Sequence, residues 1–139
     1  MDSRTEQVIG AYERIIPLGL CIDDPRGAIQ NILVDDRMNH IALISSRAGT
    51  VRGNHYHPTD RQYIYVLTGS LESYSVPVSG RTGDVRRITV PAGELLYCPP
   101  MVAHAYLFLS DCQFLNIDCD PRDPARYAEH TIPYEVWKS

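Results

Sequence analysis

The residues best suited to chemistry are three histidines and a glutamine, which lie in two separate stretches of the chain. His55 and His57 are separated by one residue, Gln62 follows five residues later, and His104 comes much further along. On a β-strand, residues two apart point to the same side, so His55 and His57 should face one cavity. Two imidazoles from one strand and a third from another can form a three-nitrogen metal site with an open position.

The same imidazoles allow a second interpretation, in which the pocket holds no metal and the histidines act on a substrate. Histidine titrates near neutral pH and is a natural base. A histidine bound to a metal ion cannot also be the free base, so the two roles compete for His55, His57 and His104. Cys98 lies close to His104 in the sequence and could line the same pocket.

Apolar and polar residues alternate with a period of two in most apolar segments, which is typical of β-strands. Short strands should therefore position these side chains. Turn signals rich in glycine, proline and aspartate separate the segments. The segments are residues 40–46, 62–68, 71–78, 85–90, 94–98, 104–109 and 114–118. Such a series predicts an all-β sandwich or barrel. One helical turn is expected near residues 124–129, and a short helix or loose arm at the start.

Composition narrows the class of protein. The 139 residues suit a single domain, 1–139, with one core. A formal net charge of −4 argues against a nucleic-acid partner, and no apolar run approaches the ~20 residues of a membrane span. Residues 1–14 lack the hydrophobic stretch of a secretion signal, so we expect a cytoplasmic location.

The spacing of the site residues resembles the two motifs of the cupin superfamily. The first motif is matched by Gly49, His55, His57, Gln62 and Gly69, and the second by Gly93, Pro99 and His104. Met101 and Phe108 replace a glycine and an asparagine that the second motif usually has. The resemblance implies a double-stranded β-helix, the cupin jelly-roll barrel, with a core of about residues 28–120 and a short N-terminal arm.

By the same resemblance, His55, His57, Gln62 and His104 take the four metal-ligand positions of the family. The family usually has glutamate where this chain has Gln62, and a neutral amide oxygen is a poorer ligand than a carboxylate. The resemblance therefore implies a divalent ion (Zn, Fe, Ni or Mn) held by three histidines, with Gln62 as a weak fourth ligand or outer partner. A metal-free pocket is the alternative.

Three shorter stretches resemble the sugar-nucleotide branch of the cupins, which includes dTDP-4-dehydrorhamnose 3,5-epimerases and dTDP-4-keto-6-deoxyhexose 3,4-ketoisomerases. The first is Ile16-Pro17-Leu18 followed by Asp24-Pro25-Arg26-Gly27, and the second is Arg52-Gly53-Asn54-His55-Tyr56-His57. The third is the interval from His57 to Gln62, which resembles that of the ketoisomerases. The resemblance implies an isomerase or epimerase that acts on a nucleoside-diphosphate sugar in carbohydrate or secondary-metabolite biosynthesis. Its base would come from the three histidines and its phenol donor from Tyr106, which shares the His104 face. Arg26 and Arg52 are the candidates for binding the diphosphate.

Two other functions remain open at this stage. A three-histidine iron centre would suit a metal-dependent enzyme such as a dioxygenase, and a barrel without turnover would be a small-molecule-binding cupin. The segment before Asp24 is rich in apolar residues for a free arm, so we also expect a homodimer in which this segment packs on, or pairs with, the second subunit.

Overall fold

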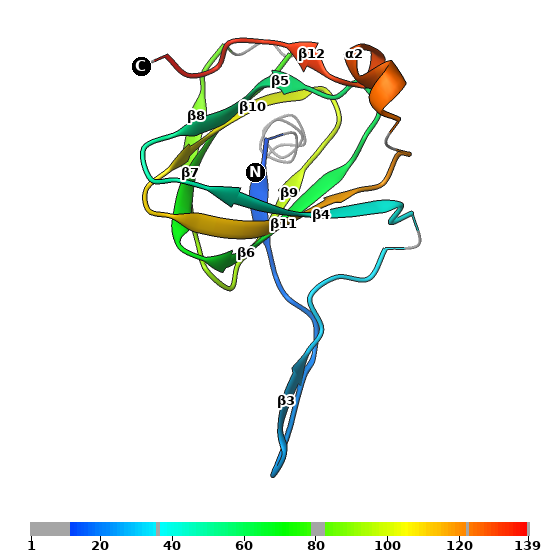
Figure 1. The fold of residues 1–139 in the computed structure, drawn as a ribbon, viewed down its shortest axis with the longest axis vertical. Coiled ribbons are helices and arrows are strands. Elements are labelled where there is room, and N and C mark those ends of the chain that lie inside the picture. The colour runs from blue at the N-terminus through cyan, green and yellow to red at the C-terminus, as the bar shows by residue number, and fades with distance from the viewer. Residues whose placement is uncertain (1–11, 36, 79–82, 122, 139) are drawn as a thin grey trace, which may run out of the picture.

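Two facing β-sheets form a barrel in the computed structural model, which describes residues 12–35, 37–78, 83–121 and 123–138 (Figure 1). The first sheet has the order β1 (Arg14–Ile16), β9 (Leu95–Cys98), β6 (Gln62–Thr68), β11 (Cys112–Asp118) and β4 (His40–Ser46). The second has the order β12 (Ile132–Pro133), β5 (Val51–Tyr56), β10 (Val102–Phe108), β7 (Ser70–Pro77) and β8 (Arg86–Pro91). All pairings are antiparallel, which confirms the all-β expectation.

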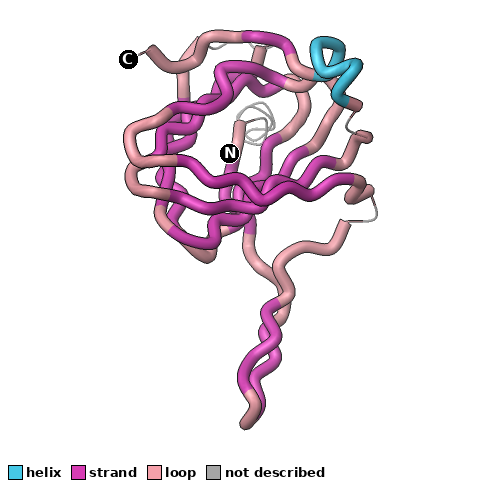
Figure 2. Tube along the Cα trace, viewed as in Figure 1, coloured by secondary structure: helices cyan, strands magenta, loops and turns pink. Residues whose placement is uncertain are grey.

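Helical structure in the described part of the chain is confined to one corner of the barrel, shown in cyan in Figure 2. A 3₁₀ turn, η1 (Pro124–Arg126), leads into a single α-helical turn, α2 (Tyr127–His130). The side chain of Asp123 caps this segment by accepting a hydrogen bond from the backbone amide of Ala125. No helix among the described residues is long and apolar enough to cross a membrane.

The period-two alternation divides the apolar residues between the inside and the outside of the barrel. In β6, Ile64 and Val66 belong to the interior, whereas Tyr63 and Tyr65 lie on the outer face of the first sheet. The interior core fills the space between the two sheets with buried aliphatic and aromatic side chains. It comprises Ile64, Val66, Leu71, Val90, Leu96, Tyr106, Phe108, Cys112 and Phe114.

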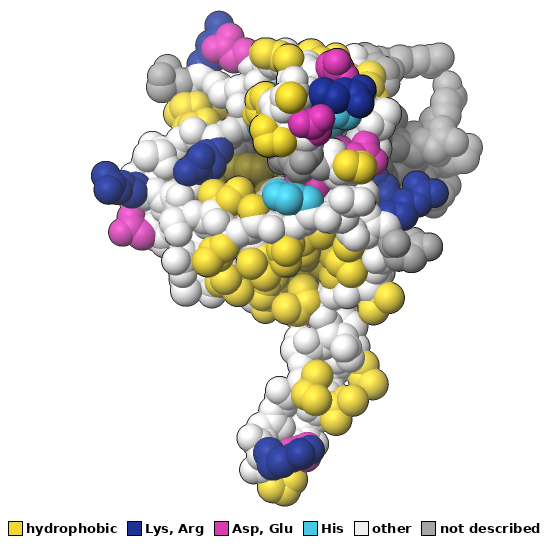
Figure 3. All heavy atoms as spheres, turned by 45° about the vertical axis from the view of Figure 1, so that its right-hand side comes forward, with side chains coloured by type: hydrophobic (Ala, Val, Ile, Leu, Met, Phe, Trp, Pro, Cys, Tyr) yellow, Lys and Arg dark blue, Asp and Glu magenta, His cyan; other side chains and the backbone are white. Residues whose placement is uncertain are grey.

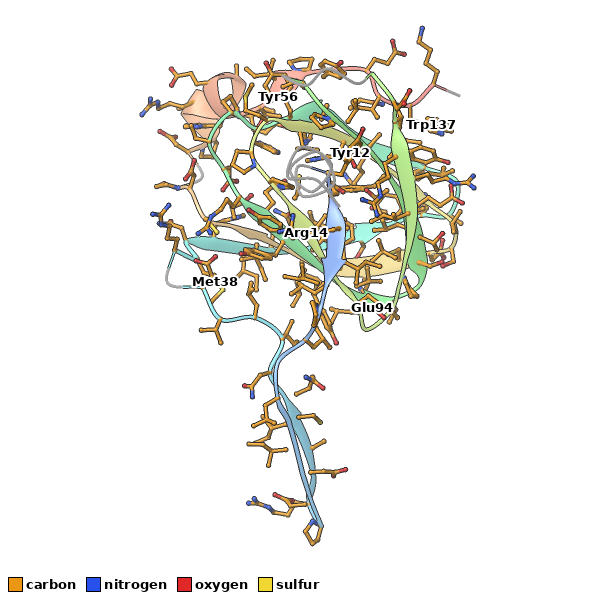
Figure 4. All side chains as sticks on the ribbon, turned by 180° about the vertical axis from the view of Figure 1, so that it is seen from behind. Tyr12, Arg14, Met38, Tyr56, Glu94 and Trp137 are labelled. Carbon is orange, nitrogen blue, oxygen red and sulfur yellow. The ribbon has the colours of Figure 1, made fainter. Side chains whose placement is uncertain are left out.

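The N-terminal segment closes the side of the barrel seen from behind in Figure 4. There β1 pairs with the edge strand β9, with Arg14 opposite Tyr97. The hydroxyl of Tyr12 donates a 2.8 Å hydrogen bond to the carbonyl oxygen of Asp84, just before β8. The segment therefore bridges the two sheets. Both β1 and β12 extend beyond the expected core of residues 28–120.

A β-hairpin projects from the barrel instead of a loose arm (Figure 1). It consists of β2 (Cys21–Asp24) and β3 (Gly27–Gln30). The Asp24 carboxylate accepts a 2.8 Å bond from the backbone amide of Arg26, and this Asx turn forms the tip. The predicted turn at Asp24-Pro25-Arg26-Gly27 is thus confirmed as a hairpin. Residues 1–11, on which part of the expected arm falls, lie outside the described residues.

Candidate active site

Strand register brings the predicted site residues into two rows that face each other inside the barrel. In the second sheet, His104 of β10 lies directly opposite His55 of β5. In the first sheet, Gln62 of β6 lies opposite Cys98 of β9 on one side and Asp118 of β11 on the other. Because paired residues share one face of a sheet, each row projects into the interior.

A β-bulge sets the direction of the strand just before His55. The register between β5 and β10 skips Asn54, which adopts a left-handed φ of 57°. The adjacent Gly53 has a φ of 94°, and a Cβ there would lie 2.8 Å from the carbonyl oxygen of His104. Only glycine permits this close approach, which lets the two histidine-bearing strands pack together.

The bulge also anchors the C-terminal segment to the site. The side-chain oxygen of Asn54 accepts hydrogen bonds from the backbone amides of Val136 and Trp137, at 2.9 and 3.0 Å. Figure 4 shows Trp137 at the barrel end that also carries Tyr56. The left-handed conformation suits asparagine, whose short polar side chain tolerates it and can hydrogen-bond locally.

The three predicted histidines form one cluster. The ring centroid of His55 lies 4.8 Å from those of His57 and His104, and the latter two are 5.7 Å apart. One nitrogen from each ring lies within 4.8 Å of the others. His57 and His104 are buried, while His55 is half-buried. Imidazole nitrogens suit zinc, iron and nickel, so this donor set fits a divalent metal ion at this position.

His57 has a fixed ring orientation. Its Nδ1 lies 2.8 Å from the carbonyl oxygen of His130, an acceptor that can only receive a proton from the ring. The proton therefore resides on Nδ1. Metal-binding histidines in proteins usually have such an outer partner, which sets both the tautomer and the ring orientation.

Gln62 lies in the barrel wall with its amide nitrogen 2.6 Å from Asp118 Oδ1. Asp118 is fully buried and also contacts His40 Nδ1 at 2.9 Å and Asn116 Nδ2 at 3.1 Å. Burial, together with this neighbouring carboxyl group, raises the pKa of Asp60 to about 7. Gln62 thus belongs to a polar network on the side of the site away from the second sheet.

The structure adds a residue that sequence reasoning missed, Glu13. It lies one residue before β1 and is completely buried. Its carboxylate accepts hydrogen bonds from the Ser73 hydroxyl at 2.5 Å and the Tyr106 hydroxyl at 2.7 Å, and lies 3.0 Å from His104 Nδ1. Burial opposes ionisation, but attraction to His104 and hydrogen bonds from His104, Cys98 and Ser73 lower the pKa of Glu13 overall. A lone acidic residue in a segment rich in apolar side chains is the only signal that pointed to it.

Tyr106 lies on the His104 face, as the alternation predicts. Its ring stacks on that of His104, with centroids 4.8 Å apart and planes at 10°. Burial and the Glu13 charge raise the pKa of Tyr106 well above its ordinary value, so its hydroxyl remains a donor. That donor is directed to Glu13.

Two cavities flank the histidine cluster. One, of about 370 Å³, is lined by residues that include Arg52, His55, Gln62, His104, Tyr106 and Tyr127. The other, of about 300 Å³, is lined by residues that include His40, His57, Asp60, Tyr127, His130 and Thr131. His57 is therefore brought to the cluster but lines the second cavity, whereas Arg52 lines the first.

The two predicted arginines lie in different places. Arg52 lines the larger cavity, where its Nε donates to Ser46 Oγ at 2.6 Å and its Nη2 donates to the Ser45 carbonyl at 3.1 Å. Arg26 is at the tip of the projecting hairpin, 89% exposed and paired with Asp24. The structure does not bring Arg26 to the cavity, because the turn that carries it points away from the barrel.

The fold and the motif residues together agree with one family. The cupin domain family matches residues 43–118, more than half of the chain, and the chain belongs to that family. A comparison with curated proteins found no significant match.

Solved structures show the same fold at low sequence identity. A 3'-monoepimerase, ChmJ, from Streptomyces bikiniensis in complex with dTDP-quinovose has a TM-score of 0.68 at 18% identity, over 84% of this chain and 67% of its own. A dTDP-4-dehydrorhamnose 3,5-epimerase from Sulfolobus tokodaii gives 0.66 at 21%, over 86% and 80%. The 3,4-ketoisomerase QdtA from Thermoanaerobacterium thermosaccharolyticum, in complex with TDP-4-keto-6-deoxyglucose, gives 0.67 at 16%, over 86% of each chain.

Proposed function

We propose that this cupin is an isomerase or epimerase that acts on a nucleoside-diphosphate sugar. The observation that carries the proposal is the larger cavity, which presents His55 and His104 side by side and Arg52 beside them. The shared fold supports the proposal, because three enzymes with this fold are named as acting on such sugars or are bound to them. The fold alone does not define the reaction, since one fold serves many chemistries.

The proposed chemistry is the removal of a proton from a carbon beside a carbonyl group. It requires a base for the proton and a hydrogen-bond donor for the enolate that forms. We assign the proton transfer to the pair His55 and His104, one ring accepting the proton while the other donates to the enolate oxygen. The Tyr106 hydroxyl donates to Glu13, so we do not assign it the role of enolate donor. Tyr106 instead supports the pair by stacking its ring on that of His104.

Arg52 would bind the diphosphate. A guanidinium presents several donors in a fixed plane and matches phosphate oxygens well. Its contacts with Ser46 and the Ser45 carbonyl orient this plane without neutralising its charge. With a net charge of −4 on the whole chain, a local cation beside the cavity matters for attracting an anionic ligand.

A metal-dependent cupin enzyme, such as a dioxygenase, is the second candidate. The observation in its favour is the cluster of His55, His57 and His104, whose donor set fits a divalent ion (Zn, Fe, Ni or Mn). Bound there, such an ion would supply a Lewis acid or a redox centre. A barrel that only binds a small molecule, without turnover, is the third candidate and would retain the cavity but not the proton transfer.

We further propose that the protein forms a homodimer through its hairpin and the first sheet. Leu20, Ile22 and Ile29 are exposed on or beside the hairpin, and Ile41 and Leu43 are exposed on β4, the edge strand of the sheet. Figure 3 shows apolar side chains below the barrel and along the hairpin. Exposed apolar area and an open sheet edge are features that a second copy commonly covers.

Calorimetry with nucleoside diphosphates and their sugars at low salt tests the proposal. Binding should weaken as salt rises, because part of the attraction is screened charge. Arg52→Ala should lose about 1–3 kcal/mol of binding free energy, the value of a charge-assisted hydrogen bond. Arg87→Ala, which removes the same charge from the exposed outer strand β8, is the matched control and should bind normally. No heat with any nucleotide would remove the leading function.

Proton transfer needs its own measurement. A 4-keto sugar nucleotide incubated with the protein in D₂O should exchange the hydrogen beside its carbonyl for deuterium. NMR measures this exchange. His55→Asn and His104→Asn should abolish this exchange. Binding without exchange in the wild-type protein would favour the non-catalytic candidate.

A further inference from the structure

We propose that Glu13 is a positioning residue of the barrel site, which holds the proton of His104 on Nδ1 and leaves Nε2 as the lone-pair atom facing the other two histidines. The inference rests on the proposed function only in taking His104 as the member of the histidine pair that accepts the proton, or as a metal ligand. Both the base and the metal-ligand role of His104 require the same unprotonated Nε2.

Glu13 occupies a site built for a carboxylate. It and His104 are essentially inaccessible to solvent, at 0% and 1% exposure. An isolated charge is costly there, and the surrounding donors offset that cost. Ser73 and Tyr106 donate to the carboxylate through hydroxyl groups, and the Cys98 thiol adds a weaker hydrogen bond. The 3.0 Å contact with His104 Nδ1 joins these donors.

Both Glu13 and Cys98 contact His104 Nδ1, and comparing the two contacts shows whether this nitrogen carries a proton or a lone pair. The Cys98 sulfur lies 2.9 Å from the same Nδ1. If the thiol donated to Nδ1, the ring lone pair would also face a carboxylate oxygen at 3.0 Å, a repulsive arrangement. A hydrogen bond from N–H to a carboxylate is much stronger than one from a thiol, which is a weak donor. The proton therefore belongs on Nδ1 and is donated to Glu13.

The site contains a carboxylate beside a histidine although residue 62 is a glutamine, because Glu13 provides it. Gln62 is bonded to Asp118 in the first sheet, whereas Glu13 reaches His104 from the N-terminal segment. The carbonyl oxygen of His130 fixes His57 in the same way, at 2.8 Å from its Nδ1. Two of the three clustered rings thus have their Nδ1 protons held from behind by an acceptor, the arrangement typical of ligand histidines.

The test is the tautomer of His104, read from long-range ¹H–¹⁵N correlations of the histidine rings in metal-free, full-length protein. The wild-type ring should be protonated on Nδ1. In the isosteric variant Glu13→Gln, the new amide can donate to Nδ1, so the ring should switch to the Nε2–H form. Ser73→Ala removes another donor to the same carboxylate and should leave the tautomer unchanged.

Zinc affinity, measured by chelator competition, provides a second readout. Glu13→Gln should weaken zinc binding by about 10–100-fold, the usual effect of losing such an outer partner. Cys98→Ser should have no effect. Equal loss in Glu13→Gln and Cys98→Ser would mean that the ion binds to the group Glu13, Cys98 and His104, whose ligand atoms also lie within 4.8 Å of one another, and would overturn the proposal.

The tautomer measurement decides the question even if Glu13→Gln fails to fold or zinc does not bind. A wild-type His104 protonated on Nε2 overturns the proposal, as does a folded Glu13→Gln protein with an unchanged tautomer and zinc affinity. Failure to bind any nucleotide sugar would remove the proposed function and leave the tautomer result standing.

Discussion

The side-chain amide of Gln62 donates a 2.6 Å hydrogen bond to the carboxylate of Asp118, and this contact joins β6 to β11 inside the barrel. Because Asp118 is fully buried, each donor that surrounds it helps to stabilise its charge. Restoring the glutamate that cupins usually have at position 62 would remove one donor and add a second negative charge beside it.

Gln62→Glu should therefore destabilise the metal-free protein in a pH-dependent way. At about pH 8 the free energy of unfolding should fall by about 1–3 kcal/mol, and part of it should return at about pH 5, where the two carboxyl groups can share a proton. Urea unfolding at both pH values measures this. Gln113→Glu, on an exposed position of β11, is the control; an equal loss in both variants would contradict the assignment.

His57→Ala should abolish stoichiometric binding of a divalent ion, because each imidazole supplies one of three nitrogen ligands. Metal analysis after incubation with zinc, iron, nickel and manganese checks the prediction. His130→Ala should keep the metal, since its contact with His57 uses the backbone carbonyl oxygen. Wild-type protein that stays metal-free in all four would refute metal binding.

Asp60 should make stability fall as the pH rises. Its pKa is near 3.8 in the unfolded chain and about 7 in the folded protein, because of burial and the neighbouring Asp118. Between these values the folded state binds more protons, so the free energy of unfolding decreases with increasing pH. Asp60→Asn retains an acceptor for the backbone amides of Cys119 and Asp120 and should flatten this slope in denaturant titrations. Asp23→Asn, on the hairpin, should leave the slope unchanged.

Ile29→Glu should shift the protein from dimer to monomer in sedimentation experiments at micromolar concentration. Ile29 is 61% exposed on the hairpin, and a charge there would be buried in the proposed interface. Val85→Glu changes an exposed apolar residue beside β8 and should leave the dimer intact. A wild-type protein that sediments as a monomer would exclude the interface.

The histidine cluster was predictable because it depends on two local rules. Alternation places His55 and His57 on one side of a strand, and motif spacing places His104 on another strand of the same barrel. The structure confirms the all-β fold and the strands at His55 and His104, whereas β5 ends at Tyr56, one residue before His57. The bulge at Asn54 was not predicted, since nothing in the alternation shows where one residue is skipped.

Glu13 and Arg26 show where local rules are insufficient. The role of Glu13 depends on partners brought close only by the pairing of β1 with β9, which the apolar pattern of residues 12–18 did not reveal. Arg26 was assigned to the site through a short motif, and its turn was predicted correctly. The direction in which the hairpin leaves the barrel decides its position, and this depends on tertiary structure.

Glu13 is separated by 60 residues from Ser73 and by 93 from Tyr106 along the chain. During synthesis, at roughly 5–20 residues per second, Glu13 leaves the ribosome well before β10. The carboxylate must therefore stay hydrated until the strands that receive it have been made. Contacts of such long range also slow folding. The site cannot mature before nearly the whole barrel exists, so a fragment ending ahead of β10 would have no functional centre.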